Sequence, residues 1–258
     1  MARYLRDDLG IDLEMAAVPE AYRLILTDEG VDARVPFGVP ELIRTVESHV
    51  PGSSAALSRY MDLCGEVLGT LNYLDQHRTD FDKRQLLGKY RNFLNTGGYT
   101  VDQVSDALAL PRRVRDLIYP YWCFLGVPMS RLSFTIWAAM LYTYFSAGAM
   151  IPRRRSHALA SALLRRFEEL GGRALFNRRV AEITCRGGGI TGVRTAAGET
   201  FAAPTLVCNV SPTVVFGRLV RPPAEVPAAA LRTVRARRHG MSTFVVYLGL
   251  DAPKERLG

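Results

Sequence analysis

Apolar residues follow a strand period and then a helix period along the first half of the chain. Tyr22–Thr27 and Val31–Val35 are β-prone and flank a turn at Asp28-Glu29-Gly30, which predicts a hairpin. After Pro40, apolar residues recur every three or four positions, as in helices with one buried face. The first predicted helix is Glu41–Val50, and the second begins at a cap formed by Ser53-Ser54 and ends at Leu71. The others are Lys83–Phe93, Thr100–Leu108 with a capping box at its start, Arg112–Phe124 and Ser130–Ser146.

The pattern changes near Ile151. Ser156–Leu170 predicts one more amphipathic helix, which Gly171-Gly172 ends. Short strand patterns follow, separated by glycine-rich turns. They are Ala174–Phe176, Val180–Cys185, Ile190–Thr195, Glu199–Ala202, Leu206–Asn209 and Thr243–Leu250. The order of elements predicts an α+β fold in which a helical region precedes a helix and a β-meander.

Residues 187–192 match the glycine pattern GxGxxG, but their context differs from that of a dinucleotide-binding turn. Such a turn needs a helix directly after it, because the helix N-terminus binds the pyrophosphate. Here Val193-Arg194-Thr195 is strand-like, and no Asp or Glu follows at the spacing expected of a ribose ligand. We interpret these glycines as a hairpin turn.

Leu132–Ile151 carries no charge over 20 residues, a length that could cross a bilayer. Its aromatic side chains are spread along the whole segment, whereas those of membrane helices prefer the two interfaces. We favour a buried helix lining an apolar cavity, with membrane-surface contact and a true span as the alternatives. Together with the aromatics just upstream, this segment predicts a site for a long apolar ligand.

Charge and cysteine content refine this picture. The chain has 258 residues and a net charge of +8, yet residues 1–100 carry 11 basic and 15 acidic side chains. The basic second half indicates either an anionic partner or an ordinary solvated surface. Four widely spaced cysteines, without CxxC or nearby histidine, predict reduced core residues and no metal site. The N-terminus carries no secretory signal, which indicates a cytoplasmic protein.

No motif for hydrolytic, zinc or P-loop chemistry is present, so no catalytic residue is assigned. Arg153-Arg154-Arg155 precedes a predicted helix. These arginines could contact phosphate or an anionic membrane, or simply lie in a solvated loop. A nucleic-acid site is disfavoured, because aromatics and arginines are not interleaved on one recognisable module.

The second half of the sequence resembles a known family. Ile151-Pro152-Arg153-Arg154-Arg155 with Leu159 is similar to the "YPRGGxxxL" segment of the phytoene desaturase and carotenoid isomerase family, FAD-dependent flavoproteins related to the amine oxidases. The similarity continues through Asn177–Ile183, Gly192-Val193-Arg194 and Ala197-Gly198-Glu199. It ends at Leu206–Pro212, which resembles the family's "VVSNADP" strand.

The resemblance implies a helical substrate-binding region at 1–150 and a partial FAD-binding region at 151–258. Main-chain atoms of Val180 would contact the adenine of FAD, and Cys208 and Asn209 would lie near its adenosine and pyrophosphate. A long isoprenoid would occupy a tunnel in the helical block. The implied substrate-binding residues are Trp122, Phe124, Trp137, Tyr142, Pro152 and Arg153.

Three features depart from the family pattern. No strand–GxGxxG–helix unit precedes Arg3, the C-terminal glycine-rich flavin segment is missing, and Arg154 and Arg155 replace the paired glycines. We therefore expect the middle portion of a longer enzyme, arising from a truncated frame, a split gene or a decayed copy. This chain alone is expected to bind FAD weakly or not at all.

Two hypotheses about function follow. The first is an FAD-dependent oxidoreductase that desaturates or isomerises a carotenoid or isoprenoid polyene by hydride transfer with flavin. The alternative is a non-catalytic isoprenoid-binding or membrane-associated remnant of that family. The expected partner is the small polyene, with peripheral membrane contact as a further option and no nucleic acid.

Overall fold

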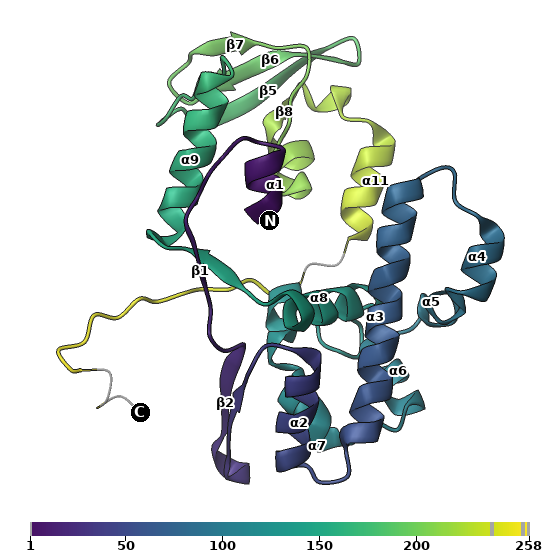
Figure 1. Ribbon diagram of the computed structural model, residues 1–258. Helices are drawn as coiled ribbons and strands as arrows, with labels where there is room; N and C mark the ends of the chain where they lie inside the picture. Colours follow the sequence, from purple (N-terminus) through teal and green to yellow (C-terminus); the bar gives the residue numbers. More distant parts are fainter. Residues whose placement is uncertain (1, 238–239, 254–255, 257–258) are drawn as a thin grey trace. The chain divides into compact units, whose positions relative to one another are not determined.

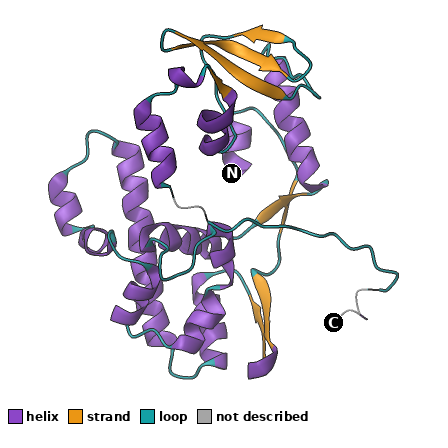
Figure 2. Cartoon of the chain, turned by 180° about the vertical axis from the view of Figure 1, so that it is seen from behind, coloured by secondary structure: helices purple, strands orange, loops and turns teal. Residues whose placement is uncertain are grey.

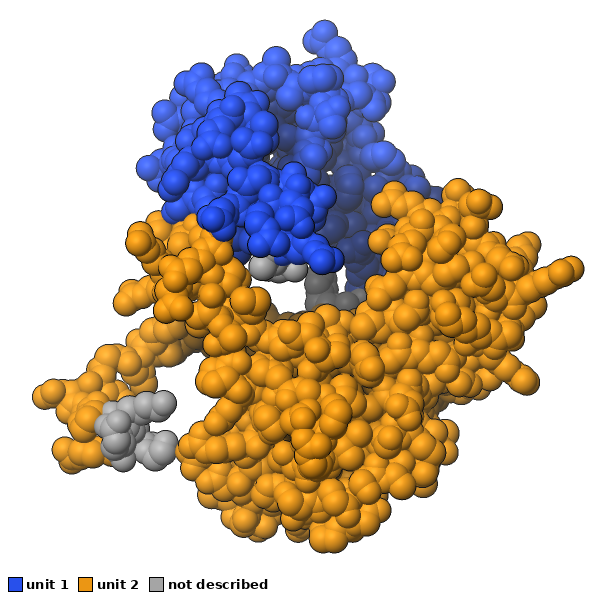
Figure 3. All heavy atoms as spheres, viewed as in Figure 1, with its two compact units in different colours: residues 1, 3–12, 159–239 blue, residues 2, 13–158, 240–258 orange. Residues whose placement is uncertain are grey.

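The computed structural model describes residues 2–237, 240–253 and 256, which form two compact units. Unit 1 is built on residues 3–12 and 159–239, and unit 2 on residues 13–158 and 240–258 (Figure 3). Unit 2 holds most of the helices, whereas the largest sheet belongs to unit 1 (Figure 2). The predicted α+β class is confirmed.

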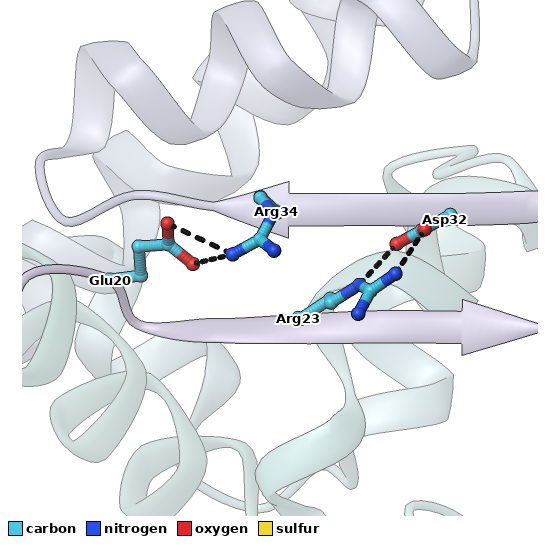
Figure 4. A network of polar contacts seen from close by, with 4 residues as sticks. All are labelled: Glu20, Arg23, Asp32 and Arg34. Carbon is cyan, nitrogen blue, oxygen red and sulfur yellow. Dashed lines mark hydrogen bonds and ion pairs between the residues drawn. The ribbon is translucent and has the colours of Figure 1, made fainter. Parts of the chain in front are cut away.

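Unit 2 contains the predicted hairpin, β2 (Tyr22–Leu26) paired antiparallel with β3 (Val31–Val35). Arg23 and Arg34 lie directly opposite each other across the two strands, an unfavourable pairing of like charges. Figure 4 shows how acids offset it: Arg23 binds both carboxylate oxygens of Asp32 at 2.7 and 2.6 Å, and Arg34 reaches Glu20 at 3.2 Å. The opposite face buries Ala33 and Val35 in the core.

The helices of unit 2 surround one hydrophobic core. Buried side chains come from the hairpin and from several helices, with Trp137 and Tyr60 the largest of them. The indole N–H of Trp137 donates to the Tyr60 hydroxyl at 2.9 Å, which satisfies both polar groups inside the core. The helices are α2 (Val39–His49), α3 (Ser54–His77), α4 (Lys83–Gly88), α5 (Arg91–Thr96), α6 (Val101–Ala107), α7 (Arg112–Ile118), the 3₁₀ helix η2 (Pro120–Leu125) and α8 (Phe134–Ala147) (Figure 1).

Local capping explains where several of these helices begin. The predicted capping box at Thr100 is confirmed, with reciprocal hydrogen bonds between Thr100 and Gln103. At the start of α3, the predicted Ser53 side-chain cap is wrong. Glu47 takes this role by accepting the backbone N–H groups of Gly52 and Ser54, each at 2.6 Å, and these bonds lower the pKa of its carboxyl.

Two predicted helices are each broken in the structure. Lys83–Phe93 is divided into α4 and α5, and between them Tyr90 is buried against the ring of Tyr73 on α3. Arg112–Phe124 ends as an α-helix at Ile118, since Pro120 cannot continue it and starts η2 instead. Within the uncharged segment, α8 buries one face, which includes Phe134 and Trp137, and leaves Ile136 exposed, so the expected buried helix is confirmed for that face. Within the described residues, no helix has both the length and the apolar character needed to cross a membrane.

Unit 1 contains a four-stranded sheet in the order β7-β6-β5-β8. The predicted meander is confirmed, and Gly187 and Gly188 form the turn between its first two strands with positive φ angles of 61° and 80°. A small core of Ile183, Val215 and Val220 lies beside the sheet. The elements are α1 (Ala2–Asp7), α9 (Arg155–Glu169, which begins in unit 2), β5 (Val180–Arg186), β6 (Gly189–Thr195), β7 (Thr200–Ala202), α10 (Pro212–Val214), a π-helical turn (Val215–Leu219), β8 (Val220–Arg221) and α11 (Ala228–Ala236).

Three strand predictions are wrong. Ala174–Phe176, Leu206–Asn209 and the described segment Thr243–Leu250 form no strand. A strand exists only when another strand accepts its hydrogen bonds, and none is paired with these segments in the described residues. Most of their apolar side chains stay exposed, with Val207 at 94%, whereas Leu206 packs against the small core of unit 1. A strand pair that was not predicted joins β1 (Met15–Ala17) to β4 (Met150–Pro152) in unit 2.

The cysteine prediction is correct only in part. All four thiols are free, but Cys64 alone is buried, and Cys208 is exposed. Among the described residues, no group of three or more His, Cys, Asp or Glu side chains could hold a metal ion.

Arg155 has a backbone conformation that glycine would adopt more easily. Its φ angle is 69°, in the left-handed region, at one of the two positions where the resembling family has glycine. A Cβ atom in this region costs about 1–2 kcal/mol. The arginine therefore occupies a glycine conformation at the start of α9.

We expect Arg155→Gly to raise the free energy of unfolding by about 0.5–1 kcal/mol, because relief of strain exceeds the added freedom of the unfolded chain. Urea unfolding followed by circular dichroism measures this. The matched control is Arg154→Gly, whose position has no positive φ, and we expect it to lower stability. Equal destabilisation by both variants would contradict the account of strain.

Candidate functional site

An apolar cavity of about 220 Å³ in unit 2 has the character expected of a hydrocarbon site. Its lining side chains come from η2 and α8: Tyr121, Phe124, Met140, Leu141 and Tyr144. Phe124 is 73% exposed and stacks on Tyr121 at 5.1 Å between ring centroids. The wall thus consists of aromatic rings and aliphatic chains.

Both tyrosine hydroxyls of this wall are bound elsewhere. The Tyr121 and Tyr144 hydroxyls lie 2.6 and 3.0 Å from the carbonyl oxygen of Ala21, and 2.5 Å from each other. Burial, followed by the neighbouring Tyr144 hydroxyl, raises the pKa of Tyr121. Both hydroxyls therefore donate their hydrogen bonds within the protein, and the cavity presents mainly carbon atoms to a ligand.

The six substrate-binding residues predicted from the resemblance lie in different places within unit 2. Phe124 lines this cavity, whereas Trp122 lines another, of about 440 Å³, beside Tyr119. Trp137 is fully buried in the core. The structure therefore does not bring these three aromatic side chains together around one cavity.

The other three predicted residues have local packing roles. Tyr142 packs on the backbone of α3, where an added Cβ at Gly65 would lie 2.8 Å from its ring. Pro152 pairs with Met15 across β1 and β4, and Arg153 forms an ion pair with Glu14 at 2.6 Å. Their contact with a substrate stays a prediction. Tyr144 belongs to the aromatic segment predicted to suit an apolar ligand, whereas Met140 is not predicted, although its i, i+4 spacing from Tyr144 on the predicted helix is a usable signal.

The cofactor-binding residues predicted from the resemblance belong to unit 1. Val180 begins β5, and β8 pairs only with Ile183 and Thr184 of that strand. The first residues of β5 therefore have no strand on this side within the described residues. An unpaired strand edge can hydrogen-bond the edge of an adenine ring, so this edge fits the nucleotide end of FAD.

Unit 1 contains a cavity of its own, of about 350 Å³, beside the same sheet. Cys185, Cys208 and Glu225 line it, together with apolar side chains such as Ile183 and Phe216. The volume is near the lower end of the range for drug-sized ligands, which suits one ring system rather than a whole dinucleotide. Asn209 is exposed next to Cys208.

The glycine turn of the meander does not fit the pyrophosphate of FAD. The Glu225 carboxylate accepts the backbone N–H groups of Gly187 and Gly188 at 3.0 and 2.7 Å. These are the groups that a phosphate would need, and a carboxylate there repels an anion. The interpretation of Gly187–Gly192 as a hairpin turn is confirmed. The described residues thus fit the adenine side of FAD, and the weak binding expected of this chain alone stays a prediction.

Comparison with known proteins shows the family to which the chain belongs. The sequence matches the flavin containing amine oxidoreductase family over residues 6–257, so the chain belongs to that family. It is similar to phytoene desaturase (lycopene-forming) from Paracoccus sp. (strain N81106 / MBIC 01143), with 31% identity over 109 residues, and to the protein of that name from Pantoea ananas, with 27% identity over 112 residues.

These alignments cover only parts of the proteins compared. They span 42% and 43% of this chain and 22% of each relative. The phytoene desaturase-like resemblance and FAD as the family's cofactor are confirmed. The chain corresponds to a limited part of each relative.

We expect stability to fall at high pH because of buried tyrosines. Burial raises the pKa of Tyr119 from 10.0 to about 12. The unfolded chain loses this proton above pH 10, while the folded chain keeps it until about pH 12. The free energy of unfolding therefore decreases through that window, by about 1.4 kcal/mol per pH unit for each such group.

Urea unfolding at several pH values measures this slope. Tyr119→Phe should reduce the slope between pH 10 and 12 by the contribution of one tyrosine, about 1.4 kcal/mol per pH unit. Tyr99→Phe, at an exposed tyrosine, is the matched control and should leave the slope unchanged. Identical slopes for all three proteins would contradict the assignment.

Proposed function

We propose that this chain is part of a cytoplasmic FAD-dependent oxidoreductase that desaturates or isomerises an isoprenoid polyene. Residues 1–150 would form its substrate-binding region and residues 151–258 part of its FAD-binding region. The family match supports the flavin chemistry, and the names of the relatives support the class of substrate. One structural observation carries the choice of substrate: the cavity beside Tyr121 and Tyr144 offers carbon and uses its hydroxyls internally.

A polyene hydrocarbon has no polar group for a site to recognise. Its binding free energy comes from apolar area removed from water, about 25 cal/mol per Å². A polar ligand in the same cavity would lose its hydrogen bonds to water and find few partners. The aromatic and aliphatic wall therefore favours a hydrocarbon chain over a polar molecule of equal size.

The chain's own residues would bind and orient the substrate and exclude water from it. FAD, when bound, supplies the hydride transfer, so a general acid–base pair is not required. On the cofactor side, Val180 main-chain atoms would contact the adenine, with Cys208 and Asn209 nearby. An insoluble polyene partitions into lipid, and peripheral membrane contact is therefore part of the proposal.

A non-catalytic isoprenoid-binding remnant is the second candidate. Arg155 favours it, since arginine stands in a left-handed conformation at a position where the family has glycine. Both candidates require polyene binding, and only the first requires flavin-dependent turnover. A product formed from polyene in the presence of FAD would decide for the enzyme.

We expect Met140→Trp to weaken polyene binding at least about tenfold, because the larger ring fills a cavity of about 220 Å³. Titration of the chain with a detergent-dispersed polyene, followed by quenching of tryptophan fluorescence, gives the dissociation constant.

The matched control is Ile136→Trp, which places the same ring at an exposed position one turn earlier on α8. It should bind as the unmodified chain does. Equal affinity of both variants would refute this cavity as the substrate site, and no saturable binding by the unmodified chain would refute the proposed substrate class.

A further inference from the structure

The segment that contains α4 and α5 reverses the local charge of the chain. Residues 1–100 are net acidic, yet the stretch from Lys83 to Val101 has four basic side chains and no acidic one. These are Lys83, Arg84, Lys89 and Arg91. None of them forms an ion pair with any residue that the structure describes.

One side of this segment is firmly attached to α3. Tyr90 is buried and lies 5.1 Å from the ring of Tyr73, and Phe93 packs against the core. The Glu66 carboxylate accepts the backbone and side-chain N–H groups of Asn92, at 3.1 and 2.8 Å. The segment therefore keeps a defined face toward unit 2.

Apolar side chains on the same segment are left in solvent. Leu87 on α4 is 67% exposed and Leu94 on α5 is 46% exposed, whereas Tyr90 and Phe93 are the side chains of this segment that face inward. Both helices lie at the periphery of unit 2, beyond α3 (Figure 1). Asp80 and Asp82 precede the segment, and Asp82 caps α4, but the cations within it have no ion-pair partner among the described residues. Exposed leucines among such cations are typical of surfaces that contact the boundary between headgroups and acyl chains.

We propose that the α4–α5 segment is a docking surface for an anionic phospholipid membrane. The cations would bind the lipid phosphates, and Leu87 and Leu94 would enter the interface. The inference rests on the membrane contact in the proposed function, and it is independent of the flavin chemistry. It places that contact on α4 and α5 rather than on Arg153-Arg154-Arg155, where Arg153 is already paired with Glu14.

The decisive variant is Lys83→Glu combined with Arg91→Glu. Each position lies in the first turn of its helix, where a carboxylate is favourable, so the segment should stay folded. The matched control, Arg154→Glu with Arg155→Glu, changes the net charge by the same amount. Lys89 is left in place because its ammonium lies over the Tyr90 ring.

Co-sedimentation with vesicles measures the partition coefficient of the full chain. The unmodified chain should bind vesicles of phosphatidylcholine with phosphatidylglycerol, bind phosphatidylcholine alone much less, and dissociate as salt is added. The Lys83/Arg91 variant should partition at least about tenfold more weakly, since each basic residue near an anionic surface contributes roughly fivefold. Leu87→Ser with Leu94→Ser should also weaken binding. The control should remain within about twofold of the unmodified chain.

Three results would overturn the proposal. If the Lys83/Arg91 variant binds as the unmodified chain does, or the control loses as much, membrane contact lies elsewhere. If the unmodified chain binds neither vesicle, the membrane contact itself is wrong, while polyene titration still tests the proposed substrate independently. Circular dichroism of each variant verifies that a loss of binding does not reflect unfolding.

Discussion

The carbonyl oxygen of Ala21 lies within hydrogen-bonding distance of two tyrosine hydroxyls, those of Tyr121 and Tyr144. Three segments meet at this point: the residue before the hairpin, the 3₁₀ helix η2 and the helix α8. A buried hydroxyl without a partner is costly, so the two hydroxyls and the carbonyl fix how these segments pack. Both tyrosines also line the neighbouring cavity, and because their hydroxyls are bound at Ala21, they leave it with a carbon surface.

The chemical character of the site follows from that packing. Substrate selection in unit 2 would depend on apolar contact and on the exclusion of water, and reactivity would depend on FAD. In unit 1, the start of β5 at Val180 has no strand on its β8 side among the described residues, and this edge would receive the nucleotide end, while Glu225 occupies the amides of the glycine turn. The family match and the cavity thus support one reading, in which this chain provides apolar binding and part of a cofactor site.

Elements that depend on nearby residues were predictable from the sequence. The hairpin at 22–35, the capping box at Thr100 and the glycine turn between β5 and β6 all form as their sequences predict. Leu206–Asn209 failed because a strand needs a partner that its own sequence does not specify. The division of α4 from α5 coincides with the burial of Tyr90 against Tyr73, a contact between separate helices that no local period encodes.

The candidate site was predictable in kind but not in detail. The aromatic content of 119–145 indicated an apolar ligand, and one predicted residue, Phe124, lines the cavity. The bonds that set its chemistry join residues 100 and 123 positions apart, so periodicity could not identify them. Trp137 shows the converse: its size and apolarity suit a ligand pocket equally well, but its indole N–H is bound to Tyr60 in the core.

The proposed function depends on the cavity beside Tyr121 and Tyr144 binding hydrocarbon in preference to polar ligands. The most direct measurement compares the dissociation constants of a polyene hydrocarbon and of its hydroxylated counterpart of the same length. We expect at least about tenfold tighter binding of the hydrocarbon at this cavity, since an unpaired buried hydroxyl costs roughly 1–3 kcal/mol. Equal or tighter binding of the hydroxylated polyene would show that the cavity recognises polar groups, and would contradict the claim.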